Sequence, residues 1–102
     1  MNMNQELLEQ AKREGCVLVA AANHRIAELW AKRNGVTRQQ FRYAYNHWDL
    51  FRLHGKLPLF VETSLWVADG LSIRRLKQEI RDRVEAGLLT VVEVSNDDYR
   101  KD

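Results

Sequence analysis

The amino-acid sequence predicts one mainly helical domain that ends in a small β-hairpin. Three observations lead to this prediction. Apolar residues recur at steps of three or four through residues 1–34 and again through residues 72–86, which is the spacing of a helix face. The pattern then changes to a β-branched apolar run at 88–94, followed by a turn cluster at 95–98. The length of 102 residues fits a single domain, 1–102.

The composition is that of a folded protein, with 45% hydrophobic and 29% charged residues. A net charge of +2 is too small to indicate a nucleic-acid partner, so the positions of the charges matter more than their sum. Cys16 is the one cysteine, which excludes an intrachain disulfide. We expect a cytoplasmic protein in which this thiol is buried or half-buried. The longest apolar stretch, 16–22, is too short to span a bilayer.

Residues 1–34 are expected to form an amino-terminal helix that ends at Asn34-Gly35. Gly15 costs roughly 1 kcal/mol in a helix interior, so the segment is either one long helix or two helices broken there, and we favour one. Its apolar stripe is long, and small residues in it allow close approach, so we expect a homodimer through this face. The predicted interface residues are Leu8, Ala11, Gly15, Leu18, Ala22, Ile26 and Leu29.

The next helix has the clearest start signal in the chain. Thr37 and Gln40 form a capping box, while Val36 and Phe41 stand at the two ends of a hydrophobic staple. We expect this helix to end near His54-Gly55. Its broad apolar face is expected in the core rather than stacked on bases, and comprises Phe41, Ala44, Tyr45, Trp48 and Phe51.

The remaining elements are shorter except for the last helix. Residues 57–61 are extended and can form a short strand, and a brief helix is expected over 62–68. After the turn at 69–71, Ser72 is the candidate N-cap of a helix that ends at Gly87. This helix is expected to point Ile73, Leu76, Ile80 and Val84 inward. Residues 99–102 would return as the second strand of the hairpin.

Two helices joined by a tight turn and followed by a hairpin form a winged helix-turn-helix, here expected over 36–102. Cations without an anion among them occupy the start of the second helix, and farther along Arg83 has Glu79 as its expected partner. Arg and Gln suit base edges in the major groove and Lys suits phosphates, although the cations also fit a solvated face. The residues expected to contact double-stranded DNA are Ser72, Arg74, Arg75, Lys77, Gln78 and Arg81.

Residues 35–101 resemble the DNA-binding part of MarR-type regulators. The resemblance is carried by Gly70-Leu71-Ser72 at the turn, Gly87-Leu88-Leu89 at the opening of the wing, and Asp98-Tyr99-Arg100 at its tip. It implies that Arg100 enters the minor groove and that Asp98 orients it. Asn96 and Lys101 of the same wing are also expected to contact DNA. The chain departs from the family at Trp66 and Asp69 and ends in the wing, so no small-molecule effector is inferred.

The sequence therefore predicts a dimeric transcriptional regulator, expected to be a repressor, with neither cofactor nor catalytic residues. His24, His47 and His54 are scattered and match no metal-binding spacing, so no metal site is expected. Two alternatives stay open. One is a winged-helix adaptor that binds another protein, because a fold does not fix function. The other is a plasmid or phage accessory protein that binds DNA during replication or partition.

Overall fold

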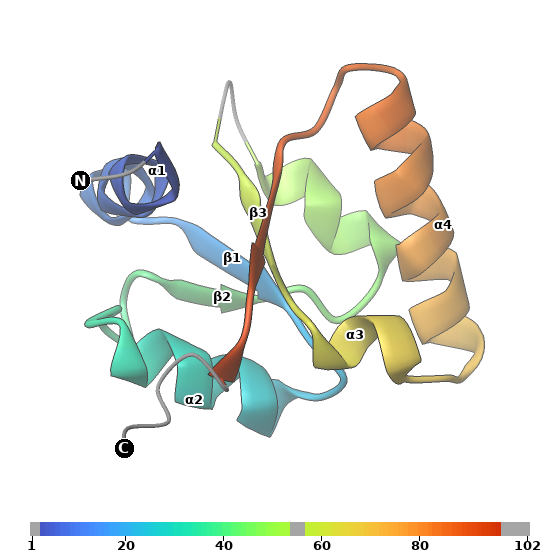
Figure 1. The fold of residues 1–102 in the computed structure, drawn as a ribbon, viewed down its shortest axis with the longest axis horizontal. Helices are drawn as coiled ribbons and strands as arrows, with labels where there is room; N and C mark the ends of the chain where they lie inside the picture. Colours follow the sequence, from blue (N-terminus) through green and yellow to red (C-terminus); the bar gives the residue numbers. More distant parts are fainter. Residues whose placement is uncertain (1–2, 54–56, 97–102) are drawn as a thin grey trace.

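The computed structural model describes residues 3–53 and 57–96, which form an α/β fold on a parallel sheet (Figure 1). The strands are β1 (Val17–Ala20), β2 (Phe41–Tyr43), β3 (Leu59–Glu62) and β4 (Val91–Val94). The helices are α1 (Met3–Arg13), α2 (His24–Arg33), α3 (Ser64–Val67) and α4 (Leu71–Glu85), with the 3-10 helix η1 (His47–Arg52).

The four strands lie in the order β2-β1-β3-β4, and every neighbouring pair is parallel. Leu18 is in register with Leu59, and Leu59 with Val91. All residues of β1 and β3 are buried. Because helices cover both faces of such a sheet, its central strands have no polar alternation, and Glu62 at the end of β3 is their one charged residue.

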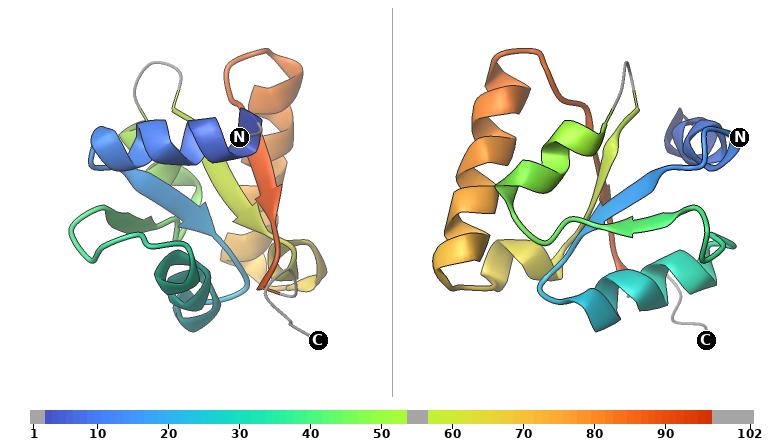
Figure 2. Two further views of the ribbon diagram at one scale, coloured as in Figure 1. Left: turned by 60° about the vertical axis from the view of Figure 1, so that its left-hand side comes forward. Right: turned by 180° about the vertical axis from the view of Figure 1, so that it is seen from behind.

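The two faces of the sheet carry separate cores. On one face α1 and α2 pack against β1, and the Trp30 ring stacks on Phe60 with 5.4 Å between ring centroids. On the other face η1, α3 and α4 cover the sheet, with Leu50, Leu65 and Leu76 buried there. Figure 1 shows α2 and α4 on opposite sides of the strands, and Figure 2 shows η1 alongside α4.

The predicted winged helix is wrong. The β-branched run at the carboxyl end does form a strand, but β4 pairs with β3 in parallel and completes the sheet rather than opening a hairpin. Three short apolar runs, at 16–22, 57–61 and 88–94, provide three neighbouring strands of one sheet. Only the first of them was expected to be helical. The predicted return strand at 99–102 lies outside the described residues.

The predicted long amino-terminal helix is also wrong. α1 ends at Arg13, and Gly15 follows with a φ of 74°, a left-handed conformation that residues with a Cβ rarely adopt. Leu18 belongs to β1 and lies in the core opposite to that of Ala11, and both are fully buried. The seven residues proposed for a dimer interface therefore do not share one face. The homodimer itself stays a prediction.

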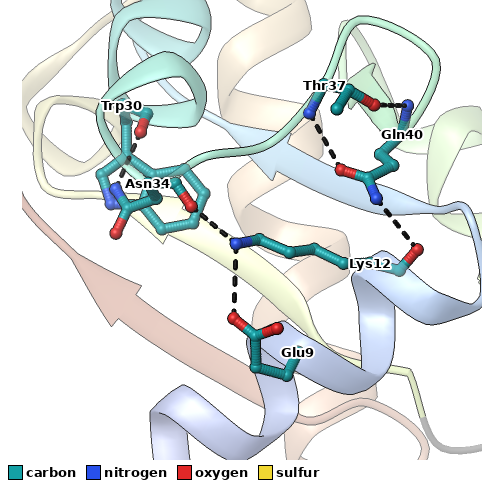
Figure 3. Close-up of polar contacts among 6 residues, drawn as sticks. All are labelled: Glu9, Lys12, Trp30, Asn34, Thr37 and Gln40. Atoms are coloured by element: carbon teal, nitrogen blue, oxygen red, sulfur yellow. Dashed lines mark hydrogen bonds and ion pairs between the residues drawn. The ribbon is translucent and has the colours of Figure 1, made fainter.

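The capping box forms as predicted, yet no helix follows it (Figure 3). The Thr37 N–H donates to Gln40 Oε1 at 2.9 Å, and the Gln40 N–H donates to Thr37 Oγ1 at 3.3 Å. The chain then enters β2, because pairing with β1 takes precedence over the local start signal. Gln40 Nε2 also donates to the carbonyl of Lys12, whose Nζ donates to the carbonyl of Asn34 at 2.7 Å. The box thus holds the end of α1, and Lys12 in turn joins α1 to the end of α2.

Other local predictions divide between right and wrong. The brief helix and the final helix exist as α3 and α4, with Leu76 and Ile80 buried, but Gly70 rather than Ser72 is the N-cap of α4. The predicted aromatic helix face does not exist, because β2 and η1 replace that helix. Of its residues Ala44 is buried, whereas three large rings are exposed. These are Tyr45, Trp48 and Phe51.

Candidate binding site at the carboxyl edge of the sheet

Polar residues follow each strand where it ends. Asn23 follows β1 closely, Tyr45 follows β2, Ser64 follows β3 and Asn96 follows β4. Because the strands are parallel, these residues gather at one edge of the sheet, toward the bottom of Figure 1, where α2, α3 and α4 begin. The strand order also reverses direction between β1 and β3. In open parallel sheets, ligands bind outside the carboxyl ends of the strands at such a switch point.

The two strands at the switch point are fastened to each other by a short contact. The Ala22 N–H, after β1, donates to Ser64 Oγ, after β3, at 3.0 Å. Asn23 then begins α2, with its Oδ1 accepting from the Ile26 N–H at 2.9 Å. The loop that leaves β1 is therefore held at both of its ends.

Glu62 holds the ends of β3 and β4 together from the buried interior, with only 4% of its surface exposed. Its carboxylate accepts from the N–H of Ser64 at 2.8 Å, from the N–H of Asn96 at 3.1 Å and from the Thr63 hydroxyl at 3.4 Å. Burial acts to raise the pKa of Glu62, but the hydrogen bonds from Ser64, Asn96 and Thr63 together lower it below its usual value. Glu62 is thus a carboxylate with a structural role.

Asn96 joins this arrangement to α2. Its Nδ2 donates to the Ile26 carbonyl at 3.3 Å, and its own carbonyl accepts from Arg33 Nη1 at 3.0 Å. Asn96 was expected to contact DNA from a wing. In the structure its backbone and side-chain donors are used within the chain.

A hollow of about 410 Å³ lies at this edge, between the layer of α2 and the layer of α4. Three segments form its wall: the loop from β1 into α2, the end of β2, and the first turn of α4. The lining residues are Ala22, Asn23, His24, Tyr43, Tyr45, Ser72 and Ile73. We call it the edge hollow.

Aromatic rings dominate one wall of the edge hollow. The His24 ring meets Tyr43 edge to face at a centroid distance of 5.2 Å, and Tyr43 meets Tyr45 at 6.3 Å. Burial raises the pKa of the Tyr43 hydroxyl above its usual value, and charge on Tyr45 and Asp49 raises it further. The group therefore stays a neutral hydrogen-bond donor. Within residues 3–53 and 57–96, the hydroxyls of Tyr43, Tyr45 and Ser72 have no hydrogen-bond partner.

The amino-terminal ends of two helices border the same hollow. α2 begins at His24, and α4 begins at Leu71 after Gly70 without a side-chain cap. The first N–H groups of a helix carry partial positive charge and have no partner within the helix. A negatively charged group is therefore favoured at this edge.

Two of the three cations at the start of α4, Arg74 and Lys77, are bonded within the chain. Arg74 donates from Nε to Asp69 at 2.8 Å, and this bond, a backbone bond from Gly70 and the Arg74 charge lower the Asp69 pKa to about 2. Lys77 Nζ donates to the carbonyls of Trp66 at 3.0 Å and Ala68 at 2.7 Å. Neither cation is presented freely at the start of the helix.

The rest of the predicted DNA-binding set is spread over the surface of α4. Gln78 donates to Asp82 at 2.9 Å, and the Arg81 guanidinium lies 5.9 Å from the centre of the Trp66 ring. The expected pair of Arg83 with Glu79 is confirmed at 2.7 Å. Ser72 lines the edge hollow, and Arg75 lines a second hollow of about 260 Å³ with His47, Gln78 and Glu79. Asp98, Arg100 and Lys101 lie outside the described residues.

Sequence reasoning missed His24, Tyr43 and Tyr45 as residues of one site, and Tyr45 was wrongly expected in the core. A signal for them was present. Short apolar runs are followed by polar or aromatic residues at 23–24, 45–46, 63–64 and 95–96. Had the runs been recognised as parallel strands, these residues would have been placed at one edge.

Other kinds of site find no support in the described part of the chain. No group of three His, Cys, Asp or Glu side chains there is placed to hold a metal ion. None of the helices in those residues is both long and apolar enough to cross a membrane. Comparison of the chain with protein-family models, curated proteins and solved structures finds no match.

Proposed function

We propose that this protein binds a small molecule of the nucleotide class, with a planar ring and a negatively charged group, in the edge hollow. The observation that carries the proposal is the coincidence of this hollow with the switch-point edge of a parallel sheet. Its volume of about 410 Å³ falls within the range of ligand pockets, roughly 300–1,000 Å³.

The lining suits both halves of such a ligand. A planar ring can stack against Tyr45 or His24, because aromatic rings associate in offset or edge-to-face arrangements. The hydroxyls of Tyr43 and Ser72, which have no partner among the described residues, supply hydrogen bonds to a ring or a sugar. A phosphate group is favoured beside the starts of α2 and α4. We propose binding, without a catalytic step.

The regulator of double-stranded DNA predicted from the sequence remains a prediction, as do the homodimer and the cytoplasmic location. The DNA-binding prediction depended on a winged helix, and the structure has a parallel sheet instead. Two of the three cations at the start of α4 are also bonded within the chain, Arg74 to Asp69 and Lys77 to two carbonyls. The edge hollow therefore supports a small ligand better than α4 supports a duplex.

Isothermal titration calorimetry with four nucleoside monophosphates, adenosine and inorganic phosphate tests this proposal. At least one monophosphate is expected to bind, and more tightly than either adenosine or phosphate, because ring and anion contact different walls. Tyr45→Ala should weaken this binding roughly 5- to 150-fold, the usual worth of a base stacked on an aromatic ring. Leu88→Ala is the control, since Leu88 is exposed beyond the far end of α4.

Two results would overturn the proposal. One is the absence of heat of binding for all four monophosphates at millimolar concentration. The other is equal affinity of the wild type and Tyr45→Ala for the monophosphate that binds best. Tyr45 is 66% exposed, so its truncation leaves both cores intact.

A further inference from the structure

We infer that the ligand of the edge hollow is one nucleotide of a single-stranded nucleic acid, whose neighbouring bases stack on η1. This inference rests on the proposed function and deepens it. The stacking surface is formed by His47, Trp48 and Phe51, which we call the ring platform. It lies on the same side of the sheet as α4 (Figure 2).

The ring platform is exposed where helical spacing predicted a buried face. Trp48 is 64% exposed and Phe51 58% exposed. Their ring centroids lie 5.8 Å apart with planes inclined by 32°, and the His47 ring lies 4.6 Å from Trp48 at 37°. Large exposed apolar side chains that gather in one place mark interaction surfaces. Here they are flat rings side by side, the form that unpaired bases stack upon.

The ring platform continues from the edge hollow along the chain. Tyr45 lines the hollow and Trp48 follows it by three residues, a reach of at most about 11 Å for an extended chain. Asp49 fixes this short connection by accepting from the N–H groups of Tyr45 at 2.6 Å and Asn46 at 3.0 Å. A base in the hollow and a base on Trp48 can therefore belong to one strand.

Positive and negative side chains around the ring platform balance one another, which limits the electrostatic contribution to the binding free energy. The Arg83 guanidinium lies 4.5 Å from the centre of the Phe51 ring and pairs with Glu79 at 2.7 Å. Arg75 stands at the second hollow, beside His47 and Glu79. Arg75 is thus placed for a phosphate, whereas Arg83 is held by Glu79 and the Phe51 ring. Binding should rest mainly on stacking, with a shallow dependence on salt.

Because the ring platform would bind bases by stacking, we infer a single strand rather than a duplex as the ligand. The base faces of a duplex are covered by their neighbours, whereas the faces of an unpaired strand are free to meet an aromatic ring. The ring platform is close to the edge hollow, and this favours a nucleic acid over a protein partner. The hollow has room for one small group, and its rings, hydroxyls and helix starts suit a nucleotide. A protein partner becomes an outcome of the test.

The experiment compares AMP with the tetranucleotides of deoxyadenylate and adenylate, and with a 12-base-pair duplex, by calorimetry on the full chain. A tetranucleotide is expected to bind at least tenfold more tightly than AMP and in preference to the duplex. The slope of log K against log[salt] should lie between about −0.7 and −1.4, as for one or two phosphates. The two tetranucleotides show whether the sugar is deoxyribose or ribose.

Variants then test whether the higher affinity of the tetranucleotide comes from the ring platform. Trp48→Ala should lower the affinity for the tetranucleotide roughly 5- to 150-fold and leave that for AMP unchanged, while Trp48→Phe retains most of the gain. Val67→Ala is the control, because Val67 is 86% exposed on α3. Circular dichroism confirms that each variant is folded.

The failures of the two proposals are distinguishable. Loss of binding for every mononucleotide contradicts the proposed function. If AMP binds but neither tetranucleotide binds more tightly than AMP, only the role of the ring platform is contradicted. The same holds if Trp48→Ala lowers the affinities for AMP and for the tetranucleotide equally. If the duplex binds as tightly as the tetranucleotides, stacking of unpaired bases is excluded. In each of these last cases a protein partner becomes the better assignment for Trp48 and Phe51.

Discussion

Glu62 is the one buried acid among the described residues. Its carboxylate satisfies N–H donors on Ser64 and Asn96 in the interior, so it organises the edge of the sheet without facing a ligand. The hydrogen bonds depress its pKa below the usual 4.5 despite burial. A depressed pKa means that its contribution to stability is fully present above the unfolded pKa and is lost as the pH falls through the folded pKa.

Glu62→Gln is therefore expected to destabilise the fold by about 1–3 kcal/mol at pH 7, because the amide cannot accept all three bonds. Below pH 4.5, as the wild-type carboxyl takes up its proton, the difference between the two proteins should shrink progressively. Urea unfolding at pH 7 and at pH 3 measures both effects. Glu93→Gln, at an exposed acid on β4, is the matched control. A difference between wild type and Glu62→Gln that persists unchanged at pH 3 would contradict this role.

At the scale of elements, the loop between α2 and β2 shows why a local signal did not determine the structure. The Thr37 and Gln40 pair makes the hydrogen bonds of a helix start, but those bonds involve only four residues. They do not set the conformation of the residues after Gln40. Pairing of β2 with β1 does, and it depends on residues that lie far away in the sequence.

Gln40→Ala is expected to cost about 1–2 kcal/mol of unfolding free energy. It removes the acceptor of the Thr37 N–H and the donor to the Lys12 carbonyl, and so loosens α1 from this loop (Figure 3). Gln39→Ala is a closely matched control, because Gln39 is an exposed neighbour of the same type and should change stability by less than about 0.5 kcal/mol. Urea denaturation compares the two, and equal losses would contradict a structural role for the box.

The segments of β3 and β4 were predicted as extended, but those of β1 and β2 were predicted as helix, for a physical reason. In β1 all four residues are buried, so the run has no polar alternation, and its apolar residues also satisfy a helix periodicity. α4, by contrast, is amphipathic and was predicted within two residues at each end. The helix stops at Asn34-Gly35 and Gly87 were predicted as well, because they depend on local conformation.

At the scale of the whole molecule, the wrong prediction of how the strands pair led to a wrong prediction of where the site lies. A hairpin after α4 implied a DNA-binding wing, whereas a fourth parallel strand implies a carboxyl edge with a ligand site. Among the described residues that were predicted to contact DNA, Ser72 alone lines the edge hollow. His24 and Tyr43 could not be grouped with it from the sequence, because the parallel arrangement of β1 and β2 brings these segments together.

The central claim is that ligand binds at the edge hollow, and mapping of backbone amide shifts by NMR tests it most directly. Titration of the nitrogen-15-labelled chain with the tightest-binding monophosphate is expected to shift amides in three separate segments. These are 22–24, 43–45 and 72–73, the segments that line the hollow. Shifts confined to α1 and the far end of α4, or no saturable shifts in the three segments, would contradict the claim.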